Sequence, residues 1–136
     1  MANFLLVIGV KSASESIVRQ IMQFVHQGAG PENKILVVDS DVDVFNMSQV
    51  LHAFATKCHP GHGIYTAKYP YMNGLSPFLS MEERNTSQGF GVAFDCTWPD
   101  NWSKETEVPP RASFKEMYPE DMTRKIAKNW KRWGYK

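Results

Sequence analysis

Apolar residues near the amino terminus form two short runs with a helical stripe between them. The runs at 4–10 and 34–38 predict two strands that are covered on both faces. Between them, apolar residues recur at helical spacing behind Ser12 and Glu15, which stand in the order of a capping box. Residues 28–31 hold two glycines and a proline and should end this helix. The order strand, helix, strand predicts a βαβ unit with a parallel pair of strands.

The middle of the chain continues this alternation of helix and strand. A second helix should begin at Asn46 and end before Pro60, where Pro and Gly residues break the pattern. Short strands are expected at 64–67 and 91–94, and the irregular stretch 69–88 predicts a long connection between them. These elements predict an α/β fold of three layers, with a mostly parallel sheet of about four strands.

The carboxy-terminal segment has the pattern of an amphipathic helix that begins at Pro119. Its apolar stripe consists of side chains at helical spacing, namely Met122, Ile126, Trp130 and Trp133. Aromatic side chains on a terminal helix suit a subunit interface, so Trp130 and Trp133 are interface candidates. We expect residues 1–112 to form the α/β domain and residues 113–136 to form a helical tail.

Composition excludes several classes of protein. The chain has 136 residues, 43% of them apolar, and a formal net charge of +1. This charge gives no reason to expect a nucleic-acid partner, and the basic face of the last helix is better explained as a solvated face. No apolar stretch reaches the ~20 residues that a bilayer requires, so no membrane partner is expected. Two cysteines exclude a disulfide-dense scaffold and favour a reducing compartment, the cytoplasm.

Three aspartates alternate directly after the second predicted strand. Asp39, Asp41 and Asp43 could point the same way and converge on a cation. Val44 and Val50 occupy the positions where an EF-hand loop requires Gly and Glu, so an EF-hand is excluded. A structural role, in which the three aspartates cap helices and hold loops, is the favoured interpretation of this acidic turn.

Other chemistry-bearing residues do not complete a site. Cys58, His59 and His62 are capable of binding a metal, but their spacing is better explained by a turn after the helix. No signature of a catalytic cysteine surrounds Cys58 or Cys96, and no phosphate-binding glycine motif is present. The residues alone predict a domain with an acidic turn, a long loop and a Trp-rich tail, and they specify no reaction.

Residues 34–60 (KILVVDSDVDVFNMSQVLHAFATKCHP) resemble the carboxy-terminal domain of the UbiD family. Residues 4–11 (FLLVIGVK) are similar to the preceding strand of that family, and 91–99 (GVAFDCTWP) to its closing Asp-Ala-Thr strand. The form of this last segment looks most like the branch that acts on hydroxybenzoates such as gallate, vanillate and protocatechuate. Within these segments the chain departs from the family at three positions: His52 replaces Trp, Lys57 replaces Arg, and Cys96 replaces Ala.

The resemblance implies a role in aromatic acid decarboxylation. In the family, a Phe-Pro-Leu-x-Pro stretch lines the substrate pocket, and residues 73–78 are similar to it. The substrate-pocket candidates are therefore Asn73, Leu75, Pro77 and Phe78. Leu75 and Pro77 match the family pattern, whereas Asn73 and Gly74 depart from it. The Asn73 amide could pair with a phenol oxygen of a hydroxylated ring.

The same resemblance implies that the reaction requires more than this chain. The family uses prenylated flavin mononucleotide with a divalent metal, held by residues that lie upstream of this domain. No catalytic residue, metal ligand or flavin ligand is therefore assigned here, and the chain alone should be inactive. The expected partner is a larger UbiD-type catalytic subunit or a missing amino-terminal part, within a homo- or hetero-oligomer.

Two other functions stay open at this point. The chain could be a stand-alone binding or regulatory protein that kept the fold without the chemistry. It could also be a small metal-dependent enzyme that uses the acidic turn, although no complete ligand set supports this.

Overall fold

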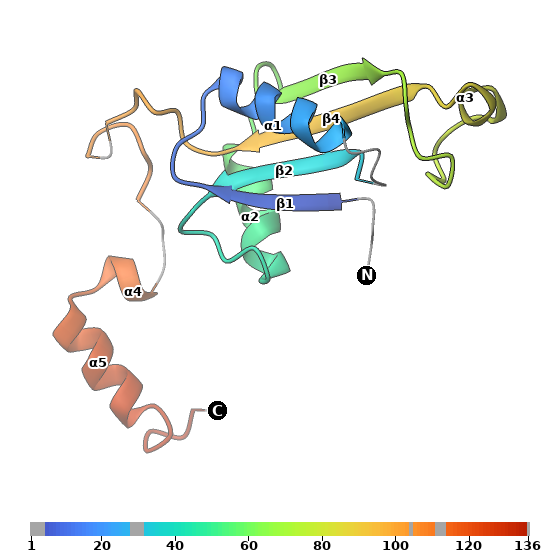
Figure 1. Cartoon of the computed structure of the whole chain (residues 1–136). Coiled ribbons are helices and arrows are strands. Elements are labelled where there is room, and N and C mark those ends of the chain that lie inside the picture. Colours follow the sequence, from blue (N-terminus) through green and yellow to red (C-terminus); the bar gives the residue numbers. More distant parts are fainter. Residues whose placement is uncertain (1–4, 28–31, 104, 111–113, 136) are drawn as a thin grey trace. The chain divides into compact units, whose positions relative to one another are not determined.

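The computed structural model describes residues 5–27, 32–103, 105–110 and 114–135 (Figure 1). The chain divides into two compact units, Met1–Asn101 and Trp102–Lys136, and each is described by itself. The domain boundary expected between residues 112 and 113 lies outside the described residues, as do the residues 28–31 that were expected to stop the first helix.

The first unit is built on a four-stranded sheet. Its strands are β1 (Leu5–Val10), β2 (Lys34–Asp39), β3 (Ile64–Tyr69) and β4 (Gly89–Cys96), in the order β1-β2-β4-β3. β2 pairs in parallel with both β1 and β4, whereas β3 pairs antiparallel to β4. The predicted α/β fold with a mostly parallel sheet is confirmed, and the parallel β1–β2 pair confirms the βαβ unit.

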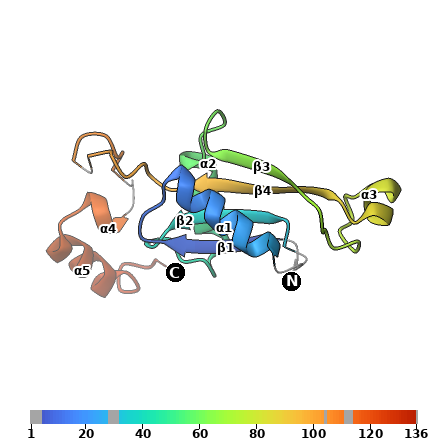
Figure 2. The same cartoon turned by 45° about the horizontal axis from the view of Figure 1, so that its top comes forward.

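Helices α1 (Glu15–Gln27) and α2 (Met47–Lys57) cover opposite faces of this sheet (Figures 1 and 2). The alternation of side chains along β2 separates the two cores. Ile35 and Val37 pack with residues of α1, whereas Leu36 and Val38 pack with residues of α2. Because both faces are covered, β2 is apolar over its buried residues 35–38, as its sequence pattern predicts.

Three local expectations are corrected. Ser12 does not cap α1, because its hydroxyl donates to Asp100 Oδ2 at 2.7 Å and α1 begins only at Glu15. The stretch expected to be irregular contains a short helix, α3 (Met81–Thr86), and a capping box formed by Ser80 and Glu83 begins it. β4 runs from Gly89 to Cys96, so the strand expected at 91–94 begins earlier and ends later than its pattern predicts.

The second unit contains α4 (Phe114–Met117) and α5 (Glu120–Asn129). α5 begins after Pro119 with acidic residues in its first turn, which confirms the predicted terminal helix. Trp130 and Trp133 follow this helix and are 43% and 51% exposed. Among the described residues, no helix is both long enough and apolar enough to span a bilayer.

Candidate functional site

A buried ion pair holds the carboxyl end of β2. Asp39 Oδ2 accepts a hydrogen bond from Lys57 Nζ at 2.5 Å and another from the backbone N–H of Trp98 at 3.3 Å. The side chains of Lys57 and Asp39 are only 10% and 22% exposed. Lys57 Nζ also lies 5.3 Å from the centre of the Trp98 ring. The pair therefore joins the ends of β2 and α2 to the segment that follows β4.

The other two aspartates of the acidic turn do not join this pair. Asp43 Oδ1 accepts a hydrogen bond from the backbone N–H of Phe45 at 3.0 Å, which shapes the turn before α2. Asp41 is exposed. In the part of the chain that the structure describes, no three His, Cys, Asp or Glu side chains gather as metal ligands. The contacts of Asp39 and Asp43 are those of residues that hold loops, and the described donor set does not fit a divalent metal ion.

The predicted pocket segment is a loop held by hydrogen bonds at the opposite end of the sheet. Arg84 of α3 donates hydrogen bonds to the carbonyls of Ser76, Pro77 and Leu79 at 3.4, 3.3 and 3.1 Å. Asn73 Oδ1 accepts the backbone N–H of Leu75 at 2.9 Å, which fixes the first turn. We call residues 73–79 the Arg84-held loop.

This loop is attached to the sheet through a buried residue and exposes apolar side chains to solvent. Ser76 is fully buried and accepts a hydrogen bond from Asn33 Nδ2 at 2.9 Å, at the start of β2. By contrast, Leu75 is 79% exposed and Phe78 is 49% exposed. Lys34 Nζ lies 4.0 Å from the centre of the Phe78 ring. The loop is therefore a fixed apolar surface with one ammonium group beside it.

The structure brings the four pocket candidates together and separates them from the acidic turn. Asn73, Leu75, Pro77 and Phe78 share the Arg84-held loop, which lies beside α3 near the amino ends of the parallel strands (Figure 2). The acidic turn follows the carboxyl end of β2. These two sets of candidates therefore belong to different ends of the sheet.

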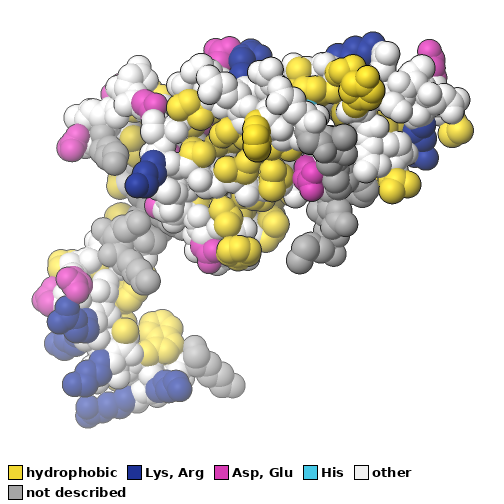
Figure 3. Space-filling model, viewed as in Figure 1, with side chains coloured by type: hydrophobic (Ala, Val, Ile, Leu, Met, Phe, Trp, Pro, Cys, Tyr) yellow, Lys and Arg dark blue, Asp and Glu magenta, His cyan; other side chains and the backbone are white. Residues whose placement is uncertain are grey.

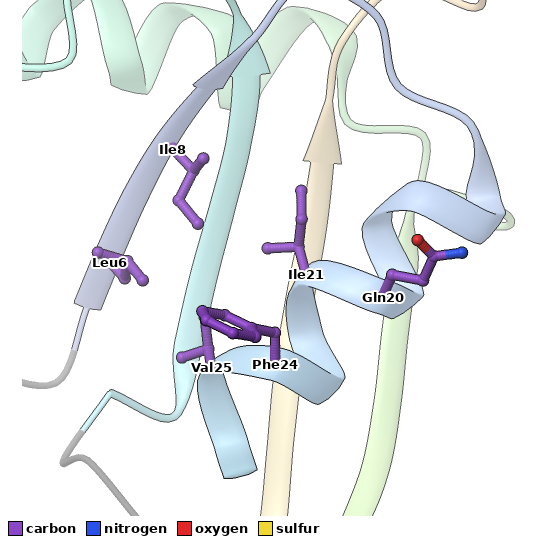
Figure 4. A pocket seen from close by; sticks show the side chains of 6 residues that line it. All are labelled: Leu6, Ile8, Gln20, Ile21, Phe24 and Val25. Atoms are coloured by element: carbon purple, nitrogen blue, oxygen red, sulfur yellow. The ribbon is translucent and has the colours of Figure 1, made fainter. Parts of the chain in front are cut away.

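An apolar groove runs between edge strand β1 and α1 (Figure 4). It has a volume of about 460 Å³, and its walls are mostly aliphatic and aromatic, consisting of Leu6, Ile8, Gln20, Ile21, Phe24 and Val25. Phe24 is 79% exposed at its rim. Hydrophobic side chains gather over this part of the surface (Figure 3). Sequence reasoning predicted a covered strand here, whereas the residues of β1 are only partly buried.

His26 is a buried polar residue that sequence reasoning did not single out. Its Nδ1 lies 2.6 Å from the carbonyl oxygen of Met22, and its ring stacks on Tyr69 with centroids 4.0 Å apart. Nε2 is buried, and no hydrogen-bond partner for it is found among the described residues. A Cβ atom on Gly91 would lie 2.0 Å from this nitrogen. The only signal in the sequence was a glycine inside an apolar strand.

The two cysteines, far apart in sequence, meet beside the α2 core. Cys58 ends α2 and is half-buried, whereas Cys96 ends β4 and is fully buried. Burial raises the pKa of both thiols, and each thiol also shifts the pKa of the other. The neighbouring His59 and His62 stack on each other with ring centroids 3.6 Å apart, within the turn that the sequence predicted.

Comparison with known proteins identifies relatives among decarboxylases. The family model of the 3-octaprenyl-4-hydroxybenzoate carboxy-lyase C-terminal domain matches residues 1–96. The pyrrole-2-carboxylic acid decarboxylase of Pseudomonas aeruginosa is 27% identical over 104 residues. That alignment covers 75% of this chain but only 20% of the relative. The chain thus spans about a fifth of the length of this curated relative.

Solved structures show the same fold. The UbiD-class enzyme HmfF of Pelotomaculum thermopropionicum, in complex with FMN, superposes with a TM-score of 0.64 at 19% identity, covering 87% of this chain and 24% of that one. The apo 3,4-dihydroxybenzoic acid decarboxylase of Enterobacter cloacae gives a TM-score of 0.59 at 26% identity, covering 90% and 26%. In both cases the present fold corresponds to about a quarter of the larger enzyme.

Proposed function

Because the chain belongs to the UbiD C-terminal domain family, we propose that it is the carboxy-terminal domain or a split subunit of an aromatic acid decarboxylase. The observation that carries this proposal is the family match over residues 1–96, in a chain that spans a fifth of its curated relative. In this role the chain supplies one wall of the substrate cleft and an oligomer interface.

The chemistry belongs, in this proposal, to the larger part of the enzyme. HmfF binds FMN, which supports a flavin in the assembled protein, and we propose prenylated FMN with a divalent metal as the cofactor. No ligand of that metal is assigned to this chain. In this proposal the chain positions the substrate, because it holds a fixed surface against the substrate and excludes water from the cleft.

The Arg84-held loop is the proposed substrate wall. Leu75 and Phe78 present apolar surface of the kind that an aromatic ring packs against. Asn73 Oδ1 is engaged by the backbone of the loop, so the amide N–H groups of Asn73 are left to meet a phenol oxygen. Lys34 places a positive charge beside Phe78, which suits an acid substrate. Hydroxybenzoic acids combine these three features and are the proposed substrates.

Two apolar surfaces support a role inside a larger assembly. Trp130 and Trp133 are half-exposed after α5, whose other side carries Lys and Arg residues (Figure 3). In the first unit, the groove between β1 and α1 exposes Phe24 beside aliphatic side chains. Surfaces of this kind are typical of protein interfaces. We propose that they are buried against the larger catalytic part and a neighbouring protomer.

The test is to purify the chain without a tag from its source and to measure the native mass together with the absorbance spectrum. A complex with a larger subunit and flavin absorbance is expected. That complex should release CO₂ from hydroxybenzoates, whereas the isolated chain should not. A colourless monomer or homo-oligomer would instead favour a stand-alone binding or regulatory protein.

Variants of the loop test the substrate wall within that complex. Asn73→Phe and Phe78→Ala should change the ratio of kcat/KM values between hydroxylated and non-hydroxylated benzoic acids. Leu51→Ala is the matched control, because Leu51 is 55% exposed on α2 and lies outside the loop. If both loop variants left the ratio at the control value, the loop would not be the substrate wall.

A further inference from the structure

Cys58 and Cys96 form a contact that connects two different elements. Both belong to the cluster on the α2 face of the sheet, where Cys58 packs against the buried residues and Cys96 is one of them. The Cys96 thiol donates to the Phe94 carbonyl at 3.6 Å. The two thiols lie close enough for each to shift the pKa of the other. The carbonyl oxygen of Gly63 connects the end of α2 to β4. It accepts a hydrogen bond from the Cys58 thiol at 3.6 Å and another from the backbone N–H of Asp95 at 2.8 Å.

We propose that Cys58 and Cys96 are a redox-sensitive pair that closes into an intramolecular disulfide under oxidants of the peroxide class. The pair differs from a structural disulfide because both thiols are free in this structure. It also differs from an isolated buried cysteine, since the side chain that would resolve an oxidised sulfur is already in contact. This inference does not depend on the proposed decarboxylase role.

The chemistry of closure can be written with hydrogen peroxide as the oxidant. The Cys58 thiolate attacks one peroxide oxygen, the O–O bond breaks, and a sulfenic acid and one water form after a proton is taken up. Cys96 then attacks the Cys58 sulfur, so that the S–S bond forms, the S–O bond breaks, and a second water leaves with the Cys96 proton. In total, two thiols lose two electrons and two protons to one peroxide.

The different burial of the two thiols sets the order of these steps. Cys58 is half-buried, whereas Cys96 is fully buried, so Cys58 is the sulfur that meets the oxidant. Burial raises the pKa of the Cys58 thiol, and the nearby Asp95 carboxylate adds to this, while the Cys96 thiol opposes it. Burial raises the pKa of Cys96 further, and Lys57 partly opposes that shift. Closure should therefore be slow at neutral pH and faster in alkaline buffer.

Closure would connect the carboxyl end of α2 to the carboxyl end of β4. A covalent link between residues so distant in sequence restricts the unfolded chain and should raise the melting temperature by at least about 5 °C. Reduction with dithiothreitol should return the original value. The reversible change makes the pair a switch of stability at this end of the sheet.

The experiment treats the reduced full-length chain with hydrogen peroxide and then maps its tryptic peptides without reduction. We expect the peptides that contain Cys58 and Cys96 to be linked within one chain, and no titratable thiols to remain after denaturation. With Cys58→Ser, the buried Cys96 should stay reduced under the same treatment. With Cys96→Ala, the Cys58 sulfenic acid should persist long enough to be trapped by dimedone.

Two results would overturn the proposal, and both are read on the unmodified chain. One is that both thiols remain titratable after free glutathione in the same tube has been fully oxidised. The other is that the linked peptides come from two different chains, as a size measurement under non-reducing conditions would reveal. Neither result bears on the native mass or the flavin absorbance of the proposed complex.

Discussion

Gly91 provides the sharpest test of the packing between α1 and the sheet. It lies on the central strand β4, opposite Ala67 of β3, and faces the ring of His26. A Cβ atom at this position would lie 2.0 Å from Nε2 and 2.7 Å from Cε1 of that ring. These distances are far below van der Waals contact, so Gly91→Ala must displace the imidazole.

The ring has little freedom to move. The ring stacks on Tyr69 with centroids 4.0 Å apart and an interplanar angle of 9°. Its Nδ1 is hydrogen-bonded to the Met22 carbonyl oxygen at 2.6 Å. Overpacking of a core costs about 1–3 kcal/mol, and loss of a hydrogen bond about 0.5–1.5 kcal/mol. We therefore expect Gly91→Ala to lower the free energy of unfolding by about 2–4 kcal/mol, a large part of the stability of a small domain.

A double-mutant cycle separates this clash from any general effect of alanine in the strand. In the His26→Ala background the clash is absent, and Gly91→Ala should cost nothing or stabilise by about 0.5–1 kcal/mol, because glycine is unfavourable inside strands. Urea unfolding followed by far-UV circular dichroism gives all four free energies. An equal cost of Gly91→Ala in both backgrounds would refute the assigned contact.

Two further predictions concern the ends of the sheet. Lys57→Met leaves the Asp39 carboxylate largely buried without its cation, and should lower the free energy of unfolding by about 1–3 kcal/mol. The matched control Arg124→Met removes an exposed ion pair of α5 and should cost under about 0.5 kcal/mol; similar losses would contradict the buried role. Near α3, the Ser80 backbone N–H and hydroxyl lower the pKa of Glu83. The resulting stability is present above the usual pKa of a glutamate and is lost as the pH falls through the lowered value, so the protection factors of the α3 amides, which are corrected for intrinsic exchange, should fall in acid. Ser80→Ala removes the hydroxyl but keeps the backbone N–H, so it should weaken this pH dependence in part, and an unchanged profile would exclude the hydroxyl as a contributor.

The sheet and its two large helices were predictable because their pattern is set by burial. Val37 and Val38 point into different cores, so β2 had to be apolar on both faces. α3 was missed because a helix of six residues has no apolar period to detect. Its capping-box signal, Ser80 followed by Glu83, was present in the sequence, but the same signal at Ser12 proved misleading. The Ser12 hydroxyl contacts Asp100, and no local pattern reports such a distant contact.

The candidate sites were predictable where their residues are neighbours in the sequence, but not where they come from distant segments. The order of residues 73–78 placed the four pocket candidates on one loop, whereas the guanidinium of Arg84 that holds this loop comes from a helix the pattern did not show. The contact of His26 with Gly91 and that of Cys58 with Cys96 join distant segments. Such pairs depend on strand order and register, which a single sequence does not specify.

The arrangement separates the two proposed roles along the strands. The ion pair of Asp39 with Lys57 and the thiol pair both lie at the carboxyl ends of β2, α2 and β4, where Lys57 and Cys58 are adjacent in sequence. The Arg84-held loop is attached instead through Asn33, at the amino end of β2. A disulfide between Cys58 and Cys96 would therefore restrain one end of the rigid sheet and leave the hydrogen bonds of the loop in place. On this reasoning, oxidation changes the stability of the domain without changing the shape of the substrate wall.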